Sequence, residues 1–280
     1  MGFVPTTPQV STAISLDRVT KTFTTSARSQ YTAVQEITLE VPEGSFVSVV
    51  GPSGCGKSTL LNLTAGLAKP SSGSVQIYRQ PLSGLNRRAS YMFQQDALLP
   101  WKTVLENVIL GLAFRSQPSA EAQERGRQWV RQVGLEGFAD SFPHQLSGGM
   151  RKRVAMAQNW IVDPDILLMD EPFSALDIHT RLKMEQELLQ LWSGSHKTVL
   201  FVTHDLEEAI ALSDEIAVLS AGPGSRLVNR YRVPLRRPRD LIDLRTQPEF
   251  IDLYRHIWAD LKQEVLKSYE RSQAAETTSV

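Results

Sequence analysis

The chain has 280 residues, of which 41% are hydrophobic, so it can bury a sizeable core as one large domain or two small ones. Its 30 basic and 30 acidic side chains cancel, which excludes a global field that would recruit nucleic acid or an anionic membrane. The single cysteine, Cys55, excludes an internal disulfide and fits a reducing cytosol.

The N-terminal segment MGFVPTTPQVSTA has no basic stretch followed by an apolar core, so it does not have the pattern of a secretory signal. No stretch of the sequence approaches the roughly 18 apolar residues that indicate a membrane-spanning helix. We therefore expect a soluble, cytosolic chain whose role at a membrane depends on a partner.

In chain order, residues 1–12 are polar and rich in Thr, Ser and Pro, and we expect them to be disordered. From Ile14 to about Leu39 apolar and polar residues alternate, which predicts antiparallel strands joined by the loop TTSARSQ. Residues 45–50 (SFVSVV) are nearly all apolar, as is typical of a strand buried on both faces. This strand leads directly into a glycine-rich turn and a helix.

Two further all-apolar strands are predicted at 165–169 and 198–202, with a helical pattern between them. Strands that alternate with helices predict a parallel sheet covered on both sides. Residues from about 92 to 157 differ, because they are rich in Gln, Arg and Ala and show no buried strand. We expect this stretch to be a helical subdomain inserted into the α/β core.

The glycine-rich turn fits the pattern G-x-x-x-x-G-K-[ST] without a mismatch. Its glycines let successive backbone N–H groups point at phosphate oxygens, and the following helix adds its positive end. Lys57 supplies a charge for the β- and γ-phosphates, and the Ser58 hydroxyl is a candidate ligand of Mg²⁺. The candidate nucleotide-binding residues are Gly51, Pro52, Ser53, Gly54, Cys55, Gly56, Lys57, Ser58 and Thr59. For Cys55 we expect a small side chain in a tight loop and not a nucleophile.

Two acids, Asp170 and Glu171, end the second buried strand, where ligands collect in open α/β sheets. Such a pair is often only a solvated loop, but the upstream phosphate loop favours a catalytic role. We predict that Asp170 holds Mg²⁺ through water and that Glu171 polarises the attacking water as general base.

A phosphate loop alone is shared by kinases, GTPases and helicases, whereas Leu146-Ser147-Gly148-Gly149-Met150 resembles the signature LSGGQ of ABC ATPases. Other elements resemble that family in the expected order over residues 14–222. They are Phe93-Gln94 (the Q-loop), Ser174-Ala-Leu-Asp177 (the D-loop) and Thr203-His204-Asp205 (the switch-histidine loop).

The resemblance implies a P-loop NTPase fold of the α/β class: a RecA-like core with a mainly parallel sheet, an antiparallel β subdomain and the inserted helical subdomain. It also implies a head-to-tail dimer in which two ATP molecules lie between the phosphate loop of one chain and the signature of the other. Ser147, Gly148 and Gly149 would then form a second anion cradle, and Asp177 would reach across the dimer. Gln94 would contact Mg²⁺ and the attacking water, and His204 the γ-phosphate.

Further positions bear on this resemblance. Phe23 lies where the family stacks an aromatic ring on adenine, although Tyr31 is an alternative and a core aromatic is another. Met150 replaces the Gln of many members, at a position where we expect hydrolysis to survive. Asn159-Trp160 is unusual, and a bulky core aromatic is the default expectation there.

The segment Ala97-Leu-Leu-Pro-Trp101 looks like the LLPW of motors from nitrate, sulfonate, taurine and bicarbonate importers, where this surface grips the membrane subunit. Trp101 is an anchor candidate, with a packed core Trp as the alternative. The stretch from Pro234 to Phe250 resembles the tail of the same motors. Apolar residues from Phe250 to Tyr269 then recur at helical spacing, so we expect a C-terminal extension (223–271) with an amphipathic helix, followed by a disordered tail (272–280).

We therefore expect an ATP-hydrolysing motor of an ABC importer for a small anion, at the cytoplasmic face of the inner membrane, with ATP and Mg²⁺ as cofactors. Expected partners are a second ATPase subunit (the same chain or a paralogue), transmembrane permease subunits and, indirectly, a periplasmic or lipid-anchored solute-binding protein, with no nucleic acid. The alternatives are a non-transport ABC ATPase and a nucleotide-sensing regulatory subunit. The presence of Glu171 and His204 disfavours the second of these.

Overall fold

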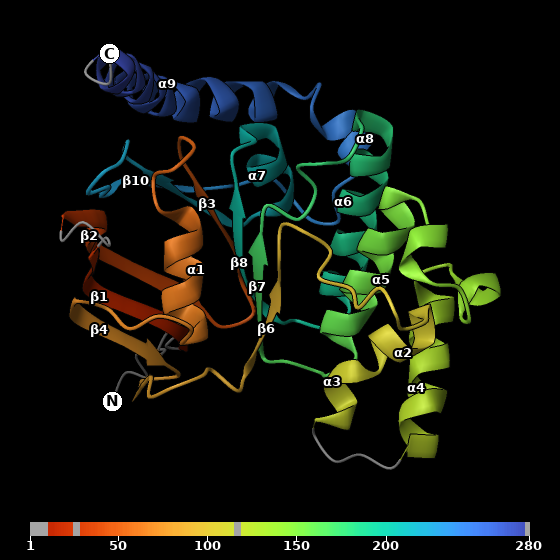
Figure 1. Cartoon of the computed structure of the whole chain (residues 1–280). Coiled ribbons are helices and arrows are strands. Elements are labelled where there is room, and N and C mark those ends of the chain that lie inside the picture. Colours follow the sequence, from red (N-terminus) through yellow and green to blue (C-terminus); the bar gives the residue numbers. More distant parts are fainter. Residues whose placement is uncertain (1–10, 25–28, 115–118, 278–280) are drawn as a thin grey trace, which may run out of the picture.

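The computed structural model describes residues 11–24, 29–114 and 119–277 (Figure 1). They form a central six-stranded sheet with a four-stranded antiparallel sheet on one side of it and a group of helices on the other. A long helix lies at the C-terminus. Within these ranges no helix is long and apolar enough to cross a membrane.

The central sheet has the strand order β10-β9-β3-β8-β7-β6, and every pair is parallel except β10 with β9. Its strands are β3 (Phe46–Val50), β6 (Ala89–Met92), β7 (Ile166–Asp170), β8 (Thr198–Thr203), β9 (Glu215–Leu219) and β10 (Leu227–Arg232). Every residue of β3 and β8 is buried, as expected for apolar strands covered on both faces. Because β3, β8 and β7 are adjacent and parallel, the loops after them meet at one edge of the sheet.

The antiparallel sheet has the order β2-β1-β4-β5. Its strands are β1 (Thr12–Thr24), β2 (Gln30–Pro42), β4 (Ser72–Ile77) and β5 (Gln80–Pro81). Helix α1 (Lys57–Ala65) lies between the two sheets and contacts β7 and β8 on one side and β2 on the other (Figure 1). The phosphate loop is therefore held between both sheets.

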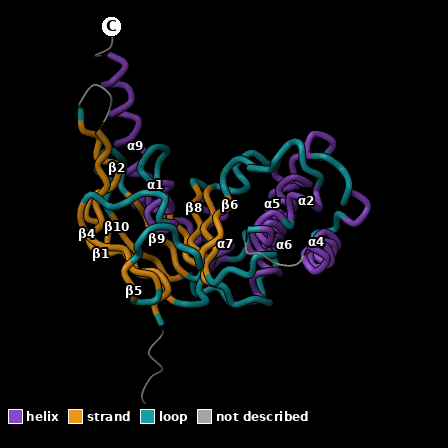
Figure 2. The backbone as a smooth tube through the Cα atoms, turned by 60° about the horizontal axis from the view of Figure 1, so that its bottom comes forward, coloured by secondary structure: helices purple, strands orange, loops and turns teal. Residues whose placement is uncertain are grey.

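The helical group forms a separate lobe beside the sheets (Figure 2). It contains α2 (Val104–Val108), α3 (Leu110–Ala113), α4 (Ser119–Gln132), two 3₁₀ turns at Glu136–Phe138 and Pro143–Gln145, and α5 (Gly148–Trp160). The lobe has its own apolar core, which includes Val108, Leu112 and Val130. Helix α5 joins it to the rest of the molecule, because Val154 packs in the lobe while Trp160 packs in the core beside the central sheet.

The remaining helices are α6 (Ile178–Ser193), α7 (Leu206–Leu212), α8 (Leu241–Leu244) and α9 (Pro248–Thr277). Helix α9 packs on α7, β9 and β10 along an apolar stripe that buries Phe250, Ile257 and Leu261. This confirms the predicted amphipathic helix and shows that its apolar face covers the core of the same chain.

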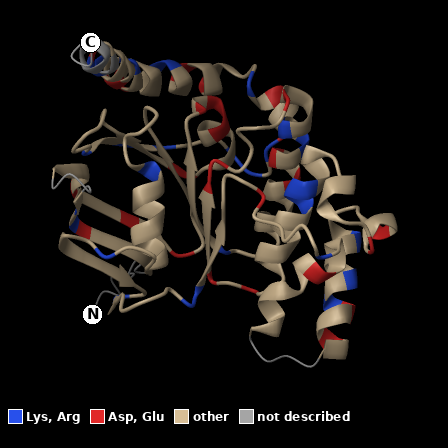
Figure 3. Ribbon diagram, viewed as in Figure 1, with Lys and Arg blue, Asp and Glu red and all other residues tan. Residues whose placement is uncertain are grey.

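Charged side chains of both signs are interspersed over the molecule. Figure 3 shows basic and acidic residues together on the helical lobe and again along α9. On α9, for example, Arg255 lies 3.7 Å from Asp252. This distribution agrees with the formal net charge of zero.

The predicted fold class is confirmed, including the antiparallel subdomain and the inserted helices. Several boundaries need correction. Helix α9 continues to Thr277, so the tail expected from residue 272 is wrong up to that point, because SQAAET is rich in helix-forming residues. The boundary expected after residue 222 separates β9 from β10, which pair with each other.

At the N-terminal side β1 already begins at Thr12, the last residue of the segment expected to be disordered, and residues 1–10 lie outside the described residues. Met92, the expected start of the helical subdomain, is still the last residue of β6. The first helix of the insertion begins only at Val104, where Thr103 and Glu106 form a capping box.

Candidate functional site

The phosphate loop runs from Gly51 to Ser58 between β3 and α1, and its path requires glycine. Gly56 has a φ of 94°, and a Cβ placed there would lie 2.6 Å from Val34 Cγ1. The Lys57 ammonium is 5% exposed and donates to the carbonyl oxygens of Gly51 (2.9 Å) and Pro52 (3.1 Å). The loop therefore curls around a buried positive charge at the N-terminus of α1, an arrangement suited to phosphate.

The side chains of this loop divide into two groups. Ser53, Gly54 and Ser58 are exposed, whereas Cys55 is fully buried. Burial raises the pKa of the Cys55 thiol, and its carbonyl oxygen accepts a hydrogen bond from the Ser225 hydroxyl. Both observations agree with a packing role for Cys55, as expected from the sequence.

Asp170, the last residue of β7, receives hydrogen bonds at both carboxylate oxygens. Ser58 Oγ donates to Oδ1 at 2.9 Å, and the hydroxyl of Tyr91 donates to Oδ2 at 3.1 Å. Burial raises the pKa of Asp170, and these two donors partly oppose that rise. The structure thus brings together Ser58 and Asp170, the two residues expected to hold Mg²⁺, and adds Tyr91, which sequence reasoning missed.

A magnesium ion fits the donors that this corner provides, because Mg²⁺ prefers oxygen ligands and takes only one or two from the protein. The Ser58 hydroxyl and the Asp170 carboxylate are such oxygens and already lie within hydrogen-bond distance of each other. No group of three or more His, Cys, Asp or Glu that could hold a metal occurs in the described part of the chain. The Gln94 amide donates to Ser174 Oγ at 3.5 Å, so its predicted contact with Mg²⁺ stays a prediction.

Glu171 lies between two basic groups. Its Oε2 is 2.8 Å from Nδ1 of His204, and its Oε1 is 3.5 Å from the Lys57 ammonium. The hydrogen bond from His204 lowers the pKa of Glu171, and the same bond raises the pKa of His204. The glutamate backbone has a φ of 43°, in the left-handed region, where strain is common at functional sites. The carboxylate is therefore ionised and fixed beside the phosphate loop.

The signature segment lies at the N-terminus of α5, on the helical lobe and away from α1 (Figure 1). Ser147 caps α5 by accepting a hydrogen bond from the backbone N–H of Met150 at 3.3 Å. A Cβ at Gly149 would lie 2.8 Å from Thr180 Cγ2, so the signature packs closely against α6. Asp177 caps α6 in the same way, accepting from the N–H of Thr180 at 3.0 Å.

Basic residues after the signature connect it to the Q-loop. The Lys152 ammonium donates to the carbonyl oxygen of Gln94 at 2.7 Å and lies 2.9 Å from Asp96 Oδ1. Arg151 forms an ion pair with the other oxygen of Asp96 at 3.0 Å. Sequence reasoning missed this link, although the basic run directly after the signature was a visible signal.

Phe23 and Tyr31 are opposite one another on β1 and β2, and each is 42% exposed. The Lys21 ammonium lies 4.9 Å from the centre of the Phe23 ring, and the Tyr31 hydroxyl lies 3.5 Å from the carbonyl oxygen of Gly54. Both rings are thus exposed, and the Tyr31 ring lies next to the phosphate loop. The alternative of a core aromatic is wrong for Phe23.

Two positions that the sequence left open now have a structural account. Trp101 is 70% exposed, so it is not a packed core Trp. Asn159 accepts a hydrogen bond from the Ser90 hydroxyl at 2.6 Å and donates to the carbonyl of Ala155 at 2.8 Å, which ties α5 to β6. Its neighbour Trp160 is buried in the core, as expected.

Comparisons with known proteins agree with this geometry. Residues 34–174 match the family described as ABC transporter. An uncharacterized ABC transporter ATP-binding protein of Methanocaldococcus jannaschii is 45% identical over 91% of this chain and 93% of its own length. The bicarbonate transport ATP-binding protein CmpD of Synechocystis sp. is 37% identical over 89% of both chains. A dimeric ATP-binding cassette solved in a post-hydrolysis state with ADP and Pi is 36% identical, with a TM-score of 0.70, over 80% of this chain and all of its own.

Proposed function

Because this chain belongs to the ABC transporter family and is its ATP-hydrolysing, ATP-binding subunit, we propose that it drives the import of a small anion. The observation that carries the hydrolytic part of this proposal is Glu171, held between Lys57 and His204 beside the phosphate loop. The anion is of the nitrate, sulfonate, taurine or bicarbonate class. The similarity to a bicarbonate transport ATP-binding protein over most of both chains supports this class.

The nucleotide binds with its phosphates on the loop from Gly51 to Thr59. Backbone N–H groups and the Lys57 ammonium hold the β- and γ-phosphates, and the Phe23 ring stacks on adenine. Ser58 and Asp170, the latter through water, would hold Mg²⁺ together with Gln94, and the bound ion would neutralise charge on the phosphate oxygens.

Glu171 acts as the general base for the attacking water. Its pKa is lowered, so the carboxylate is ionised at neutral pH, and each oxygen keeps a lone pair beyond its contact with Lys57 or His204. His204 orients the carboxylate through Nδ1, which leaves the opposite side of the ring for the γ-phosphate. Water activation and phosphate contact thus arise from one connected set of side chains.

Two copies are needed to complete each site. The signature residues Ser147, Gly148 and Gly149 lie on the helical lobe, whereas the phosphate loop lies between the sheets (Figure 1). A second copy or a paralogue in head-to-tail orientation places its signature on the γ-phosphate and brings Asp177 to the partner's loop. The dimeric state of the similar cassette supports this arrangement.

Permease subunits bind on the surface next to the Q-loop. A cavity of about 380 Å³ opens there, lined in part by the exposed rings of Phe93 and Phe114 and by Asn159. Trp101, which is not part of this lining, is also highly exposed. Exposed aromatic rings around a hollow are typical anchors for a partner helix. The chain then works at the cytoplasmic face of the membrane, with a solute-binding protein delivering the anion to the permease on the other side.

Glu171→Gln tests the proposal, because it preserves shape and removes the base. Purified wild-type protein is expected to hydrolyse ATP as a transient dimer, and the variant to lose at least about a hundredfold in turnover while accumulating as an ATP-bound dimer in light scattering. The exposed Glu249→Gln on α9 is the matched control and is expected to turn over normally. Equal turnover in Glu171→Gln and wild type would contradict the assignment of the base.

The anion is identified by uptake of labelled nitrate, bicarbonate, taurine and an alkanesulfonate in cells lacking the chain. Wild type is expected to restore uptake of one of them, and Glu171→Gln of none. Restored ATPase activity without uptake of any of the four anions would contradict the proposed anion class but not the assignment of the hydrolytic site.

A further inference from the structure

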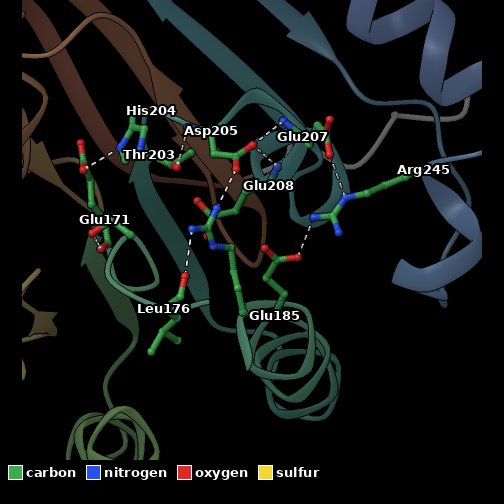
Figure 4. A network of polar contacts seen from close by, with 11 residues as sticks. Glu171, Leu176, Glu185, Thr203, His204, Asp205, Glu207, Glu208 and Arg245 are labelled. Carbon is green, nitrogen blue, oxygen red and sulfur yellow. Dashed lines mark hydrogen bonds and ion pairs between the residues drawn. The ribbon is translucent and has the colours of Figure 1, made fainter. Parts of the chain in front are cut away.

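A network of charged side chains connects Asp205, the residue after His204, to the C-terminal extension, which is the part of the chain that follows β10 (residues 233–277) (Figure 4). It begins at Asp205, which caps α7 by accepting hydrogen bonds from the N–H groups of Glu207 (2.9 Å) and Glu208 (3.2 Å). Because His204 directly precedes this cap, the position of the first turn of α7 determines where the imidazole lies relative to Glu171.

Arg181 on α6 holds this turn from the side of the D-loop. One guanidinium nitrogen forms an ion pair with Asp205 Oδ2 at 3.1 Å, and the other donates to the carbonyl oxygen of Leu176 at 3.1 Å. One side chain thus joins the D-loop to the residue after His204.

Arg245 holds the same turn from the extension. It lies directly after α8, and its Nη2 donates to Glu185 Oε2 at 3.0 Å. Its Nε lies 3.3 Å from Oε2 of Glu207, in the first turn of α7 (Figure 4). Arg245 therefore bridges α6 and α7 from the opposite side to Arg181.

The contact with Glu185 anchors this bridge. Glu185 is completely buried, one helical turn after Arg181 on α6. Burial raises the pKa of Glu185 to about 7, and Arg245 opposes that rise. The neighbouring Glu208 is also buried, and burial raises its pKa to about 8, so Glu208 is mainly neutral at pH 7. Arg245 is thus the counter-charge from the extension for an acid that has no access to water.

The extension also borders a cavity beside the network. A cavity of about 450 Å³ lies between the switch-histidine loop and α9, lined by His204, Asp205, Arg245, Tyr254 and Trp258 among others. The two α9 rings, Tyr254 and Trp258, stack with centroids 6.2 Å apart. A shift of α8 or α9 would therefore move Arg245 relative to the loop that carries His204.

We propose that Arg245 is a positioning residue through which the C-terminal extension sets the place of His204, so that ATP turnover depends on how the extension is seated. This inference rests on the proposed function of His204. Arg245 touches neither nucleotide nor water in this role, and it acts by holding the first turn of α7 through Glu207.

The main test is Glu207→Gln, which removes the ion pair to α7 and leaves the buried Arg245–Glu185 bond intact, so folding is preserved. We expect kcat to fall about two- to fivefold, the effect of one partly exposed ion pair, with the KM for ATP unchanged because the phosphate loop is untouched. Arg245→Gln is expected to lower kcat at least as much, and Arg245→Lys to recover part of it. Arg255→Gln, which removes an exposed arginine of α9, is the control and is expected to have no effect.

A double-mutant cycle with His204→Ala decides whether the effect passes through the histidine. In the His204→Ala background, Glu207→Gln is expected to cause no further loss. An equal loss in both backgrounds, or wild-type kcat in Glu207→Gln and Arg245→Gln, would overturn the inference while leaving the proposed function intact. A His204→Ala variant with normal turnover would instead overturn the assignment of His204.

Discussion

Nδ1 of His204 lies 2.8 Å from Oε2 of Glu171, and this contact joins the ends of two neighbouring strands of the central sheet. The bond shifts both groups toward their charged forms, because it lowers the pKa of the glutamate and raises that of the histidine. A base that must remain ionised and a histidine that must face phosphate therefore support each other.

The stability contributed by this pair depends on pH. Because the pKa of Glu171 is lowered in the folded protein, Glu171 stabilises the fold at pH values above its ordinary pKa of 4.5. This stabilisation is lost as the pH falls through the pKa of the folded state. Because the pKa of His204 is raised in the folded protein, His204 stabilises the fold at pH values below its ordinary pKa of 6.5. This stabilisation is lost as the pH rises through the pKa of the folded state. We expect the Tm difference between wild type and His204→Gln to be largest near about pH 5.5 and to shrink above about pH 7. A difference that grows from pH 6 to pH 8 would contradict this; the exposed His179→Gln is the control.

The phosphate loop predicts a difference between two glycine substitutions. Gly54 and Gly56 both have positive φ, 74° and 94°, but a Cβ at Gly54 has no atom within 4 Å, whereas one at Gly56 meets Val34 Cγ1 at 2.6 Å. We expect Gly54→Ala to lower the free energy of unfolding by about 1 kcal/mol, from backbone strain alone. Gly56→Ala should lower it by about 3 kcal/mol, because overpacking adds to the strain. Urea denaturation of both variants measures the difference in the free energy of unfolding. Equal losses of this free energy in the two variants would exclude a steric contribution from a Cβ at position 56.

Several features were predictable because neighbouring residues in the sequence produce them. The phosphate loop, the acid pair at the end of β7 and the helix start after Ser147 each depend on a few consecutive residues. Buried strands were also visible, since short apolar runs bounded by turn residues are typical of strands inside a parallel sheet.

The missed features depend on which elements become neighbours. Tyr91 contacts Asp170 only because β6 pairs with β7, and no local pattern reveals that pairing. The antiparallel pairing of β10 with β9 was hidden for the same reason, because Leu227–Arg232 reads as a polar segment. The ion pairs of Arg245 likewise require the relative placement of three helices, which exists only in the folded chain.

The exposed rings of Phe23 and Tyr31 predict a difference in ATP affinity between two alanine variants. If Phe23 stacks on adenine, Phe23→Ala should weaken ATP binding about tenfold, as expected for one lost base–aromatic stack, and Tyr31→Ala should weaken it less. Inorganic triphosphate, which has no base, should bind wild type and Phe23→Ala equally. Isothermal titration calorimetry with ATP and with triphosphate measures these affinities. A larger loss of ATP affinity in Tyr31→Ala than in Phe23→Ala would assign the stacking to Tyr31 instead.

Tyr91 predicts how magnesium dependence varies with pH. Burial raises the pKa of Asp170, and the hydrogen bond from the Tyr91 hydroxyl lowers it again. Tyr91→Phe removes that donor, so protonation of Asp170 begins at a higher pH, and a protonated carboxyl is a poor ligand for Mg²⁺. We expect the Mg²⁺ concentration for half-maximal ATPase activity to rise as pH falls in both proteins, and to rise earlier in Tyr91→Phe. The exposed Tyr269→Phe should follow the wild-type curve. Superimposable curves for Tyr91→Phe and wild type would show that the Tyr91 hydroxyl does not tune the aspartate.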